Sequence, residues 1–310
     1  MMQNENGKPY RVEIDQWVAD QVVTDIQAEI YKAGKIPDIP WLRSLVASIL
    51  RKPIANFSRF IARIDALARD YGFVRASQIA IEELSGGAAV AGAENIPSSG
   101  PLVIASNHPG TYDGFALISN LQREDFKIMV SGIPFFQHLP NASKYLIYST
   151  HDVNDRMQAI RQSIHHLESG GVLVIFPSGR IDPDPAVLPG AEHALSLWSR
   201  SIEIFLRKVP DAALVLAITS GVLSKEFSNK LYPRLFKNDH ERRRVMEFMQ
   251  VLKQMVRGKP VAVDPCVSFS EPLRFMTDQE KDQDAMRARI LERALSLLDA
   301  HITAFSLPRF

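Results

Sequence analysis

The chain is almost free of cysteine. Its 310 residues include one, Cys266, so no disulfide can form within the chain and a zinc site built on a cysteine cluster is disfavoured. A hydrophobic content of 46% can build a buried core without crosslinks. Because no secretory signal opens this sequence either, we expect a cytoplasmic location in a reducing compartment.

The chain also lacks an excess of charge and long apolar runs. A net charge of +1 provides no general attraction to nucleic acid or to an anionic membrane, so a membrane or an acidic partner needs a local patch. The longest uncharged run, Asn95 to Tyr112, is interrupted by proline, glycine, serine and histidine. The sequence therefore predicts no transmembrane helix.

Several catalytic motifs are missing too. We find no Gly-x-x-x-x-Gly-Lys loop, no Gly-x-Gly-x-x-Gly fingerprint and no His-Glu-x-x-His pair. Together with the missing cysteine cluster, these absences disfavour an NTPase, a dinucleotide-dependent enzyme and a structural zinc protein. His165 and His166 lie in an expected helix without metal-ligand company, so the sequence predicts no metal site and no bound cofactor.

The pattern of apolar residues changes near residue 90. Residues 10 to 85 repeat apolar side chains at helical spacing, with Pro37, Pro40 and Pro53 as punctuation, and predict three or four helices ending at Gly86 and Gly87. Six later apolar runs are expected strands: LVIAS, KIMVS, YLIYS, VLVIFP, ALVLAITS and VAVDPCVSF. Expected helices lie between or after them: Asp113 to Leu121, Asn154 to Leu167, Ala191 to Lys208, Asp239 to Arg257 and roughly Asp278 to Phe305. This alternation predicts an α/β fold with a largely parallel sheet flanked by helices, organised as an N-terminal helical bundle (1–90) and an α/β domain (91–310).

One turn combines a histidine with an aspartate. In LVIASNHPGTYDGFALI, His108 follows a strand and Asp113 begins the next helix. Asp113 could orient the imidazole of His108 for acid/base chemistry, with the other ring nitrogen facing a substrate. The spacing alone is weak evidence in a chain with 8 histidines. The alternative is that Asp113 is an ordinary helix N-cap.

A second turn is expected at the same edge of the sheet. In FPSGRIDPDP, Ser178, Gly179 and Arg180 follow the strand from Val172, and ligands of parallel sheets bind beyond the carboxyl ends of strands. Gly179 would let a ligand approach the backbone, and Arg180 offers a fork for a phosphate or carboxylate. Alternatively, Arg180 is a surface side chain paired with Asp182 or Asp184.

Together the two turns resemble motifs of the glycerolipid acyltransferase superfamily. NHPGTYD is similar to its His-x4-Asp motif, and FPSGR to its Phe-Pro-Glu-Gly-Thr-Arg motif. The pattern is most similar to the soluble plastid-type glycerol-3-phosphate acyltransferases. The resemblance implies that His108 is a general base oriented by Asp113, and that a thioester of acyl carrier protein or coenzyme A is the acyl donor. It implies no acyl-enzyme, consistent with the missing Gly-x-Ser-x-Gly elbow.

The resemblance also implies a cationic site for an acceptor phosphate, and here the chain departs from the family. The family's Lys-His pair corresponds to Thr150 and His151, and Arg180 matches one arginine while Asp182 occupies the place of another. The acceptor is therefore less defined than the chemistry. Phe135 and Phe136 of GIPFFQHLP are expected either to line the acceptor or acyl channel or to be simple core.

A basic segment opens the expected helix at Asp239. Arg242, Arg243 and Arg244 precede an apolar face formed by Val245, Phe248, Met249, Leu252 and Val256. Such a helix could lie on the inner face of a membrane or meet an acidic carrier protein. The alternative is an apolar face in the core with solvated arginines.

The sequence thus predicts an O-acyltransferase. The expected acceptor is a hydroxyl of glycerol-3-phosphate, a lysophospholipid or a related compound, and the expected substrate-binding residues are Ser178, Gly179, Arg180, His151, Phe135 and Phe136. Two alternatives remain open: a thioester or ester hydrolase that uses the same His–Asp pair, and a non-catalytic module that binds an acyl ligand.

Overall fold

A computed structural model describes residues 10–33, 36–131, 134–150, 152–228, 238–257, 262–275 and 282–310. Three helices come first: α1 (Gln16–Ala33), α2 (Pro40–Tyr71) and α3 (Phe73–Ser85). Helix α3 begins where Glu124 accepts hydrogen bonds from the backbone N–H groups of Phe73 and Val74, each at 3.0 Å. It ends at Gly86, whose φ of 84° is the left-handed conformation common after a helix.

Pro53 does not interrupt α2, contrary to its expected role as punctuation. The helix continues through it for a total of 32 residues. A proline inside a helix removes one backbone hydrogen bond. Pro53 and Ile54 are both buried, so the packing of this segment compensates for the missing bond.

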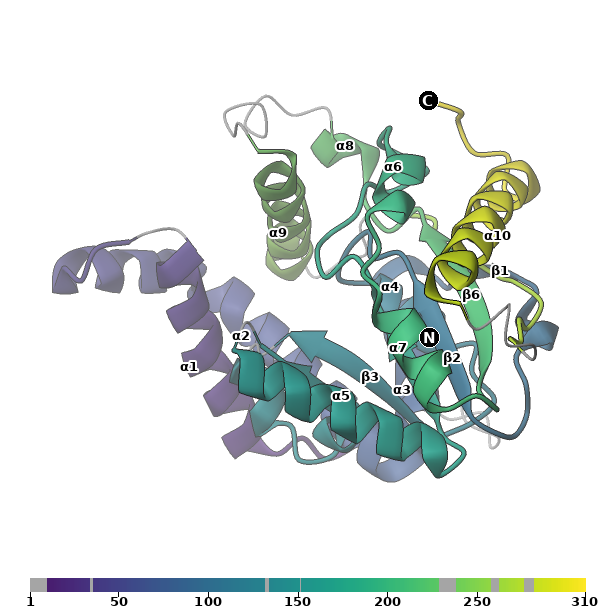
Figure 1. The fold of residues 1–310 in the computed structure, drawn as a ribbon. Helices are drawn as coiled ribbons and strands as arrows, with labels where there is room; N and C mark the ends of the chain where they lie inside the picture. Colours follow the sequence, from purple (N-terminus) through teal and green to yellow (C-terminus); the bar gives the residue numbers. More distant parts are fainter. Residues whose placement is uncertain are drawn as a thin grey trace.

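A seven-stranded sheet forms the centre of the described structure (Figure 1). Its strands are β1 (Ala89–Ala91), β2 (Leu102–Ser106), β3 (Phe126–Ser131), β4 (Leu146–Ser149), β5 (Val172–Ile175), β6 (Ala213–Ser220) and β7 (Cys266–Phe269). They lie in the order β1-β7-β6-β2-β5-β3-β4, and only the β6–β7 pairing is antiparallel. The predicted α/β fold with a largely parallel sheet is confirmed.

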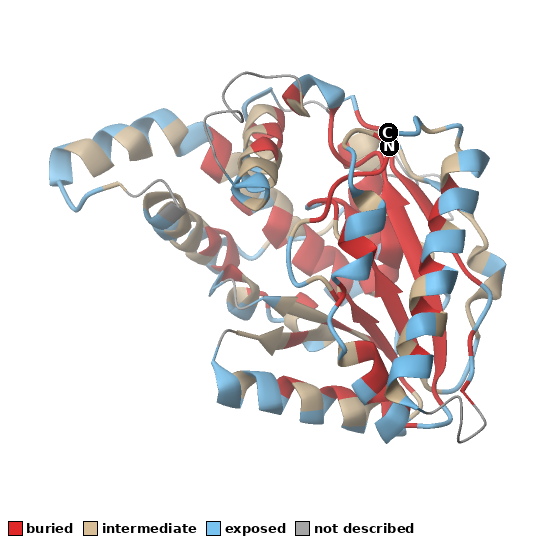
Figure 2. Ribbon diagram, turned by 45° about the horizontal axis from the view of Figure 1, so that its top comes forward, coloured by how far each residue is buried: buried red, intermediate tan, exposed pale blue. Residues whose placement is uncertain are grey.

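Helices cover both faces of the sheet. One face packs on α1, α2, α3 and α4 (Asp113–Ile118), and the other on α5 (Val153–Glu168), α6 (Ala191–Ser196), α7 (Ser201–Lys208) and α10 (Gln283–Ala304). Alternate residues of each central strand serve the two cores, as with Ile104 and Val103 of β2. Figure 2 shows the buried strands between helices whose outer sides are exposed. Within the described residues, no helix is long and apolar enough to cross a membrane.

Three smaller features differ from the sequence expectation. The expected helix Ala191 to Lys208 is two helices, because the chain turns between them where the Ser199 N–H donates to the Pro177 carbonyl at 2.9 Å. Strand β1 and the short helix α8 (Lys225–Ser228) were not predicted, because segments this short show no periodicity of apolar residues. Short 3-10 turns, η1 (Ala93–Asn95), η2 (Pro134–His138) and η3 (Ala142–Tyr145), complete the connections, and α9 spans Asp239–Arg257 as predicted.

A buried histidine joins α10 to the sheet. His301 is fully buried, and its two ring nitrogens lie 2.7 Å from the hydroxyls of Ser220 on β6 and Ser268 on β7. Burial lowers the pKa of His301 to about 4. The folded chain therefore holds this imidazole neutral at pH values where the unfolded chain would protonate it.

This depressed pKa predicts acid sensitivity of the fold. The unfolded state binds the extra proton between about pH 6.5 and pH 4, so the contribution of His301 is complete above pH 6.5 and declines as the pH falls. Between pH 7 and pH 5 we expect it to lower the free energy of unfolding by about 2 kcal/mol. Urea unfolding at both pH values should show a smaller decrease for His301→Gln than for the wild type. Exposed His165, changed to Gln, is the matched control and should keep the wild-type dependence. An identical decrease in all three proteins would contradict the prediction.

Candidate functional site

The two turns singled out in the sequence meet at one edge of the sheet. Strand β2 lies between β5 and β6, and all three run parallel, so their carboxyl ends point the same way. We call residues 107–113 after β2 the first turn and residues 176–184 after β5 the second turn. Because β2 and β5 are neighbours, these turns lie against each other, as the sequence predicts.

His108 and Asp113 form a hydrogen-bonded pair in the first turn. The Nδ1 atom of His108 lies 2.7 Å from Oδ2 of Asp113, which also accepts the Gly110 N–H at 3.2 Å. The Asp113 side chain is buried, whereas 32% of the His108 side chain is exposed. The carboxylate thus fixes one ring nitrogen of an imidazole that is partly accessible.

Asn107 attaches the first turn to β6. Its side-chain amide exchanges two hydrogen bonds with the Thr219 backbone: Oδ1 accepts the N–H at 2.7 Å, and Nδ2 donates to the carbonyl at 2.9 Å. Asn107 therefore continues the ladder between β2 and β6 by one residue. This pairing sets the point at which the chain turns away and His108 emerges.

Asp182 joins the two turns through a pair of hydrogen bonds that we call the turn clamp. The Asp182 N–H donates to the His108 carbonyl at 2.7 Å, and Oδ2 of Asp182 accepts the His108 N–H at 3.0 Å. Asp182 is buried, and burial raises its pKa to about 6. The residue that departs from the family's arginine thus positions the backbone of His108.

Asp184 binds the loop that follows β6. It is fully buried and accepts three backbone N–H groups: Ala186 at 2.9 Å, Gly221 at 2.8 Å and Leu223 at 2.9 Å. The two aspartates of DPDP therefore make different connections. Asp182 connects the second turn to the first, and Asp184 connects it to the exit of β6.

Arg180 remains on the surface of the second turn without the predicted alternative partners. The structure shows no ion pair between its guanidinium and either Asp182 or Asp184, whose carboxylates bind backbone N–H groups, so that alternative is wrong for the described conformation. Gly179 is exposed with a φ of 62°, a conformation that favours glycine. The Ser178 hydroxyl donates to the Arg180 carbonyl at 2.9 Å and shapes the turn from inside.

One aromatic ring packs against His108, and the two predicted channel phenylalanines lie in or beside the core. The Phe176 ring lies 4.6 Å from the His108 ring, centroid to centroid, and gives the imidazole an apolar neighbour. Phe135 is buried against Phe57 and Phe136, with centroid distances of 6.1 and 4.4 Å. Phe135 therefore belongs to the core, and Phe136 is half-buried at its border.

Thr150 acts locally at the start of α5. Its hydroxyl donates to Asp155 at 2.5 Å and accepts the Asp152 N–H at 3.1 Å. Through these two contacts, Thr150 stabilises the start of α5. The neighbouring candidate, His151, lies outside the described residues.

Helix α9 makes contacts with the site that the sequence interpretation missed. Glu247 accepts a hydrogen bond from the Thr111 hydroxyl in the first turn, and Arg243 donates from Nε to the Ile181 carbonyl in the second turn at 2.8 Å. Gln250 binds the loop after β6, accepting the Ser224 N–H and donating to the Val222 carbonyl, each at 2.7 Å. One helix thus contacts all three strand exits.

The buried side of α9 differs from the apolar face that the sequence analysis names. Its buried side chains are Met246, Gln250, Gln254 and Met255, whereas Phe248 and Val256 are exposed. The glutamines can be buried because their amides find backbone partners, as Gln254 does at the Leu84 carbonyl (3.1 Å). The alternative of an apolar face in the core is therefore wrong for Phe248 and Val256, whereas contact of this helix with a membrane or an acidic carrier protein stays a prediction.

Three carboxylates surround His108. Burial lowers the pKa of His108, but the negative charges of Asp113, Glu247 and Asp182 outweigh that effect and raise the pKa to about 9. Burial also raises the pKa of Glu247. These carboxylates favour the imidazolium form of His108, and a proton must leave that form before the side chain can act as a base.

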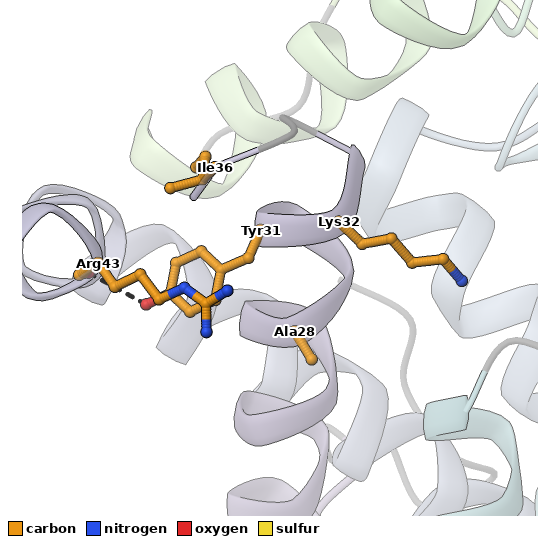
Figure 3. Close-up of a pocket in the computed structure, with 5 residues that line it drawn as sticks. All are labelled: Ala28, Tyr31, Lys32, Ile36 and Arg43. Atoms are coloured by element: carbon orange, nitrogen blue, oxygen red, sulfur yellow. Dashed lines mark hydrogen bonds between the residues drawn. The ribbon is translucent and has the colours of Figure 1, made fainter. Parts of the chain in front are cut away.

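A separate hollow of about 430 Å³ lies between α1 and the start of α2 (Figure 3). Ala28, Tyr31, Lys32, Ile36 and Arg43 line it. The Tyr31 hydroxyl donates to the Arg43 carbonyl at 3.1 Å, and the Arg43 guanidinium lies 5.0 Å from the Tyr31 ring centre. Among the described residues, none of those predicted for substrate binding borders this hollow.

Comparison with known proteins finds a family match for one part of the chain. Residues 87–217 match the family model described as Acyltransferase, in agreement with the predicted reaction class. The crystal structure of the 1-acyl-sn-glycerophosphate (LPA) acyltransferase PlsC from Thermotoga maritima aligns with 91% of this chain and 96% of its own, at 15% identity and a TM-score of 0.41. No curated protein matches the chain. Both turns lie inside the matched segment, and α9 lies outside it.

The carboxylates around His108 predict the pH dependence of a reaction that needs it as a base. Because the raised pKa of His108 favours imidazolium, kcat/KM should increase with pH well above 6.5. Glu247→Gln removes one negative neighbour and can still accept from Thr111, so the profile should shift to lower pH. Exposed Glu241, changed to Gln, is the control on the same helix, and its profile should match the wild type. Equal profiles for all three proteins would show that Glu247 does not act on His108.

Proposed function

We propose that this chain transfers a fatty acyl group from a thioester of acyl carrier protein or coenzyme A to a hydroxyl of glycerol-3-phosphate, a lysophospholipid or a related acceptor. The observation that carries the proposal is the His108–Asp113 pair at the carboxyl end of β2, held by the turn clamp. The acyltransferase match over residues 87–217 supports the reaction class.

The geometry supports His108 as the base. Asp113 holds Nδ1, which leaves Nε2 of the accessible imidazole to remove the proton of the acceptor hydroxyl. The acceptor oxygen then forms a bond to the thioester carbonyl carbon, and the carbon–sulfur bond breaks. The imidazolium returns its proton to the leaving thiolate, so the products are an ester and a thiol, and His108 is again neutral.

The same arrangement explains why Asp113 matters beyond its charge. Its carboxylate accepts from both the imidazole and the Gly110 N–H, so the ring orientation is tied to the backbone of the turn. A buried, hydrogen-bonded carboxylate also stabilises the imidazolium that forms during transfer. Asp113 is therefore proposed as an orienting and electrostatic partner of the base.

Removal of the base tests this mechanism. General base catalysis contributes about 10²–10⁴-fold, so His108→Ala should lower acceptor-dependent thiol release by at least about a hundredfold. Exposed His193, changed to Ala, is the control and should retain wild-type turnover. Mass spectrometry should detect the acylated acceptor only with an active base. Full turnover by His108→Ala would exclude the mechanism, and thiol release without an acceptor would identify a hydrolase.

We further propose that α2 contacts a membrane surface when the acceptor is a lipid. Trp41, Leu45 and Ile49 recur every fourth residue on α2, and their exposed fractions are 69%, 50% and 67%. The beginning of α2 extends away from the sheet in Figures 1 and 2. Exposed Arg51 and Lys52 follow the stripe, which suits an anionic bilayer.

Vesicle binding tests this contact. Trp41→Ser combined with Leu45→Ser should reduce co-sedimentation with anionic lipid vesicles by roughly tenfold or more, because burial of large apolar side chains contributes about 1.5–3 kcal/mol each. Val153 and Met157 provide the matched control on α5, since they are also exposed apolar residues four positions apart. Equal loss from both pairs of substitutions, or no loss from the α2 pair, would remove α2 as the contact.

A further inference from the structure

A helix distant in sequence contacts the tip of the first turn, which we define as residues 109–111. The exposed Thr111 donates a hydrogen bond from its hydroxyl to the carboxylate of Glu247 on α9. A β-carbon placed on Gly110 would lie 3.7 Å from Oε1 of Glu247 and 3.6 Å from Cγ2 of Val222. The Glu247 carboxylate therefore lies beside Gly110 as well as beside Thr111.

The turn tip also takes part in orienting the imidazole of His108. The Gly110 N–H donates to Oδ2 of Asp113 at 3.2 Å, and the same oxygen lies 2.7 Å from Nδ1 of His108. Loops at strand ends move more than the strands unless other contacts hold them. A displacement of Gly110 would remove a hydrogen bond from the carboxylate that fixes the imidazole ring.

Glu247 extends from a helix that is itself anchored on both sides of this contact. Four residues earlier, Arg243 donates to the Ile181 carbonyl at 2.8 Å. Three residues later, Gln250 donates to the Val222 carbonyl at 2.7 Å. Residues three and four apart lie on one face of a helix, so all three side chains point toward the strand exits. The contact with the turn tip is therefore made by a side chain whose helix has fixed neighbours.

We propose that Glu247 is a positioning residue for the reaction, which acts by holding the turn tip at Thr111. With the tip in place, Gly110 keeps its bond to Asp113, and Asp113 keeps the imidazole of His108 in its orientation. This inference rests on the proposed acyltransferase function. The positioning role requires a hydrogen-bond acceptor at position 247, whereas the electrostatic effect on His108 requires a negative charge there.

Substitutions at the two ends of the contact separate the hydrogen bond from the charge. Thr111→Val removes the donor and keeps the side-chain shape, and it should lower kcat at least about tenfold, because small displacements of reacting groups are costly. Its KM for the thioester should change little, and its pH profile should match the wild type, since Glu247 keeps its charge. Thr111→Ser retains the donor and should restore kcat. Glu247→Gln retains an acceptor, so its maximal kcat should stay near the wild-type value while its pH profile shifts.

The matched control is a threonine elsewhere in the chain. Thr24 of α1 is exposed and donates from its hydroxyl to the Asp20 carbonyl at 3.1 Å, so Thr24→Val also removes a hydroxyl hydrogen bond. This variant should have the wild-type kcat. Equal decreases in kcat for Thr111→Val and Thr24→Val would overturn the positioning role.

A double-mutant cycle tests whether the two residues act through one contact. Glu247→Ala removes the acceptor, so adding Thr111→Val to it should change kcat by less than about twofold. Independent, additive losses from the two substitutions would show that Thr111 does not act through Glu247, and would overturn the proposal.

Amide hydrogen exchange tests the position of the tip without substrate or turnover. In the full-length chain, Thr111→Val should raise the exchange rate of the Gly110 N–H at least about tenfold, because the bond to Asp113 opens more often. Thr111→Ser and Thr24→Val should keep the wild-type rate.

The two readouts separate this proposal from the proposed reaction. Faster exchange at Gly110 in Thr111→Val, in a protein that transfers no acyl group, would support the restraint on the tip and reject the reaction. Acyl transfer at the wild-type rate by Thr111→Val, with unchanged exchange, would overturn the positioning role while the reaction stands.

Discussion

The turn clamp is the contact on which the candidate site depends. Two hydrogen bonds between His108 and Asp182 fix the backbone of the first turn to that of the second. Without this connection, the imidazole and the cationic turn would sit on independent loops at the ends of two strands. A base and a binding group are effective only when their relative geometry is held closely. The buried position of Asp182 strengthens the contact by excluding water from it.

Sequence reasoning was sufficient where the signal was local. Short apolar runs predicted six of the strands, and turns after β2 and β5 could be assigned to one sheet edge because parallel strands share a direction. The close approach of His108 and Asp113 also follows from a strand, a tight turn and a helix start within a few residues. The three-residue strand β1 was missed because so short a segment has no measurable alternation.

Contacts between distant segments could not be predicted in the same way. Glu247 is 136 positions from Thr111, and Arg243 is 62 positions from Ile181, so no spacing rule connects them. Asp182 illustrates a second reason. Its charge suggests an unfavourable neighbour for a phosphate, but its carboxylate points to a backbone N–H, which only the folded chain reveals. The buried glutamines of α9 likewise invert the face that hydrophobicity selects.

The separation of α9 from the segment matched by the acyltransferase family has an evolutionary consequence. The His–Asp pair and both turns lie within residues 87–217, whereas Arg243 of α9, outside that segment, contacts the second turn through its side chain on a backbone carbonyl. A carbonyl acceptor places no demand on the identity of its own side chain. The contact between α9 and the second turn can therefore persist while the side chain at position 181 changes between lineages. Such an arrangement lets the two segments diverge in sequence while the helix keeps its place against the turn.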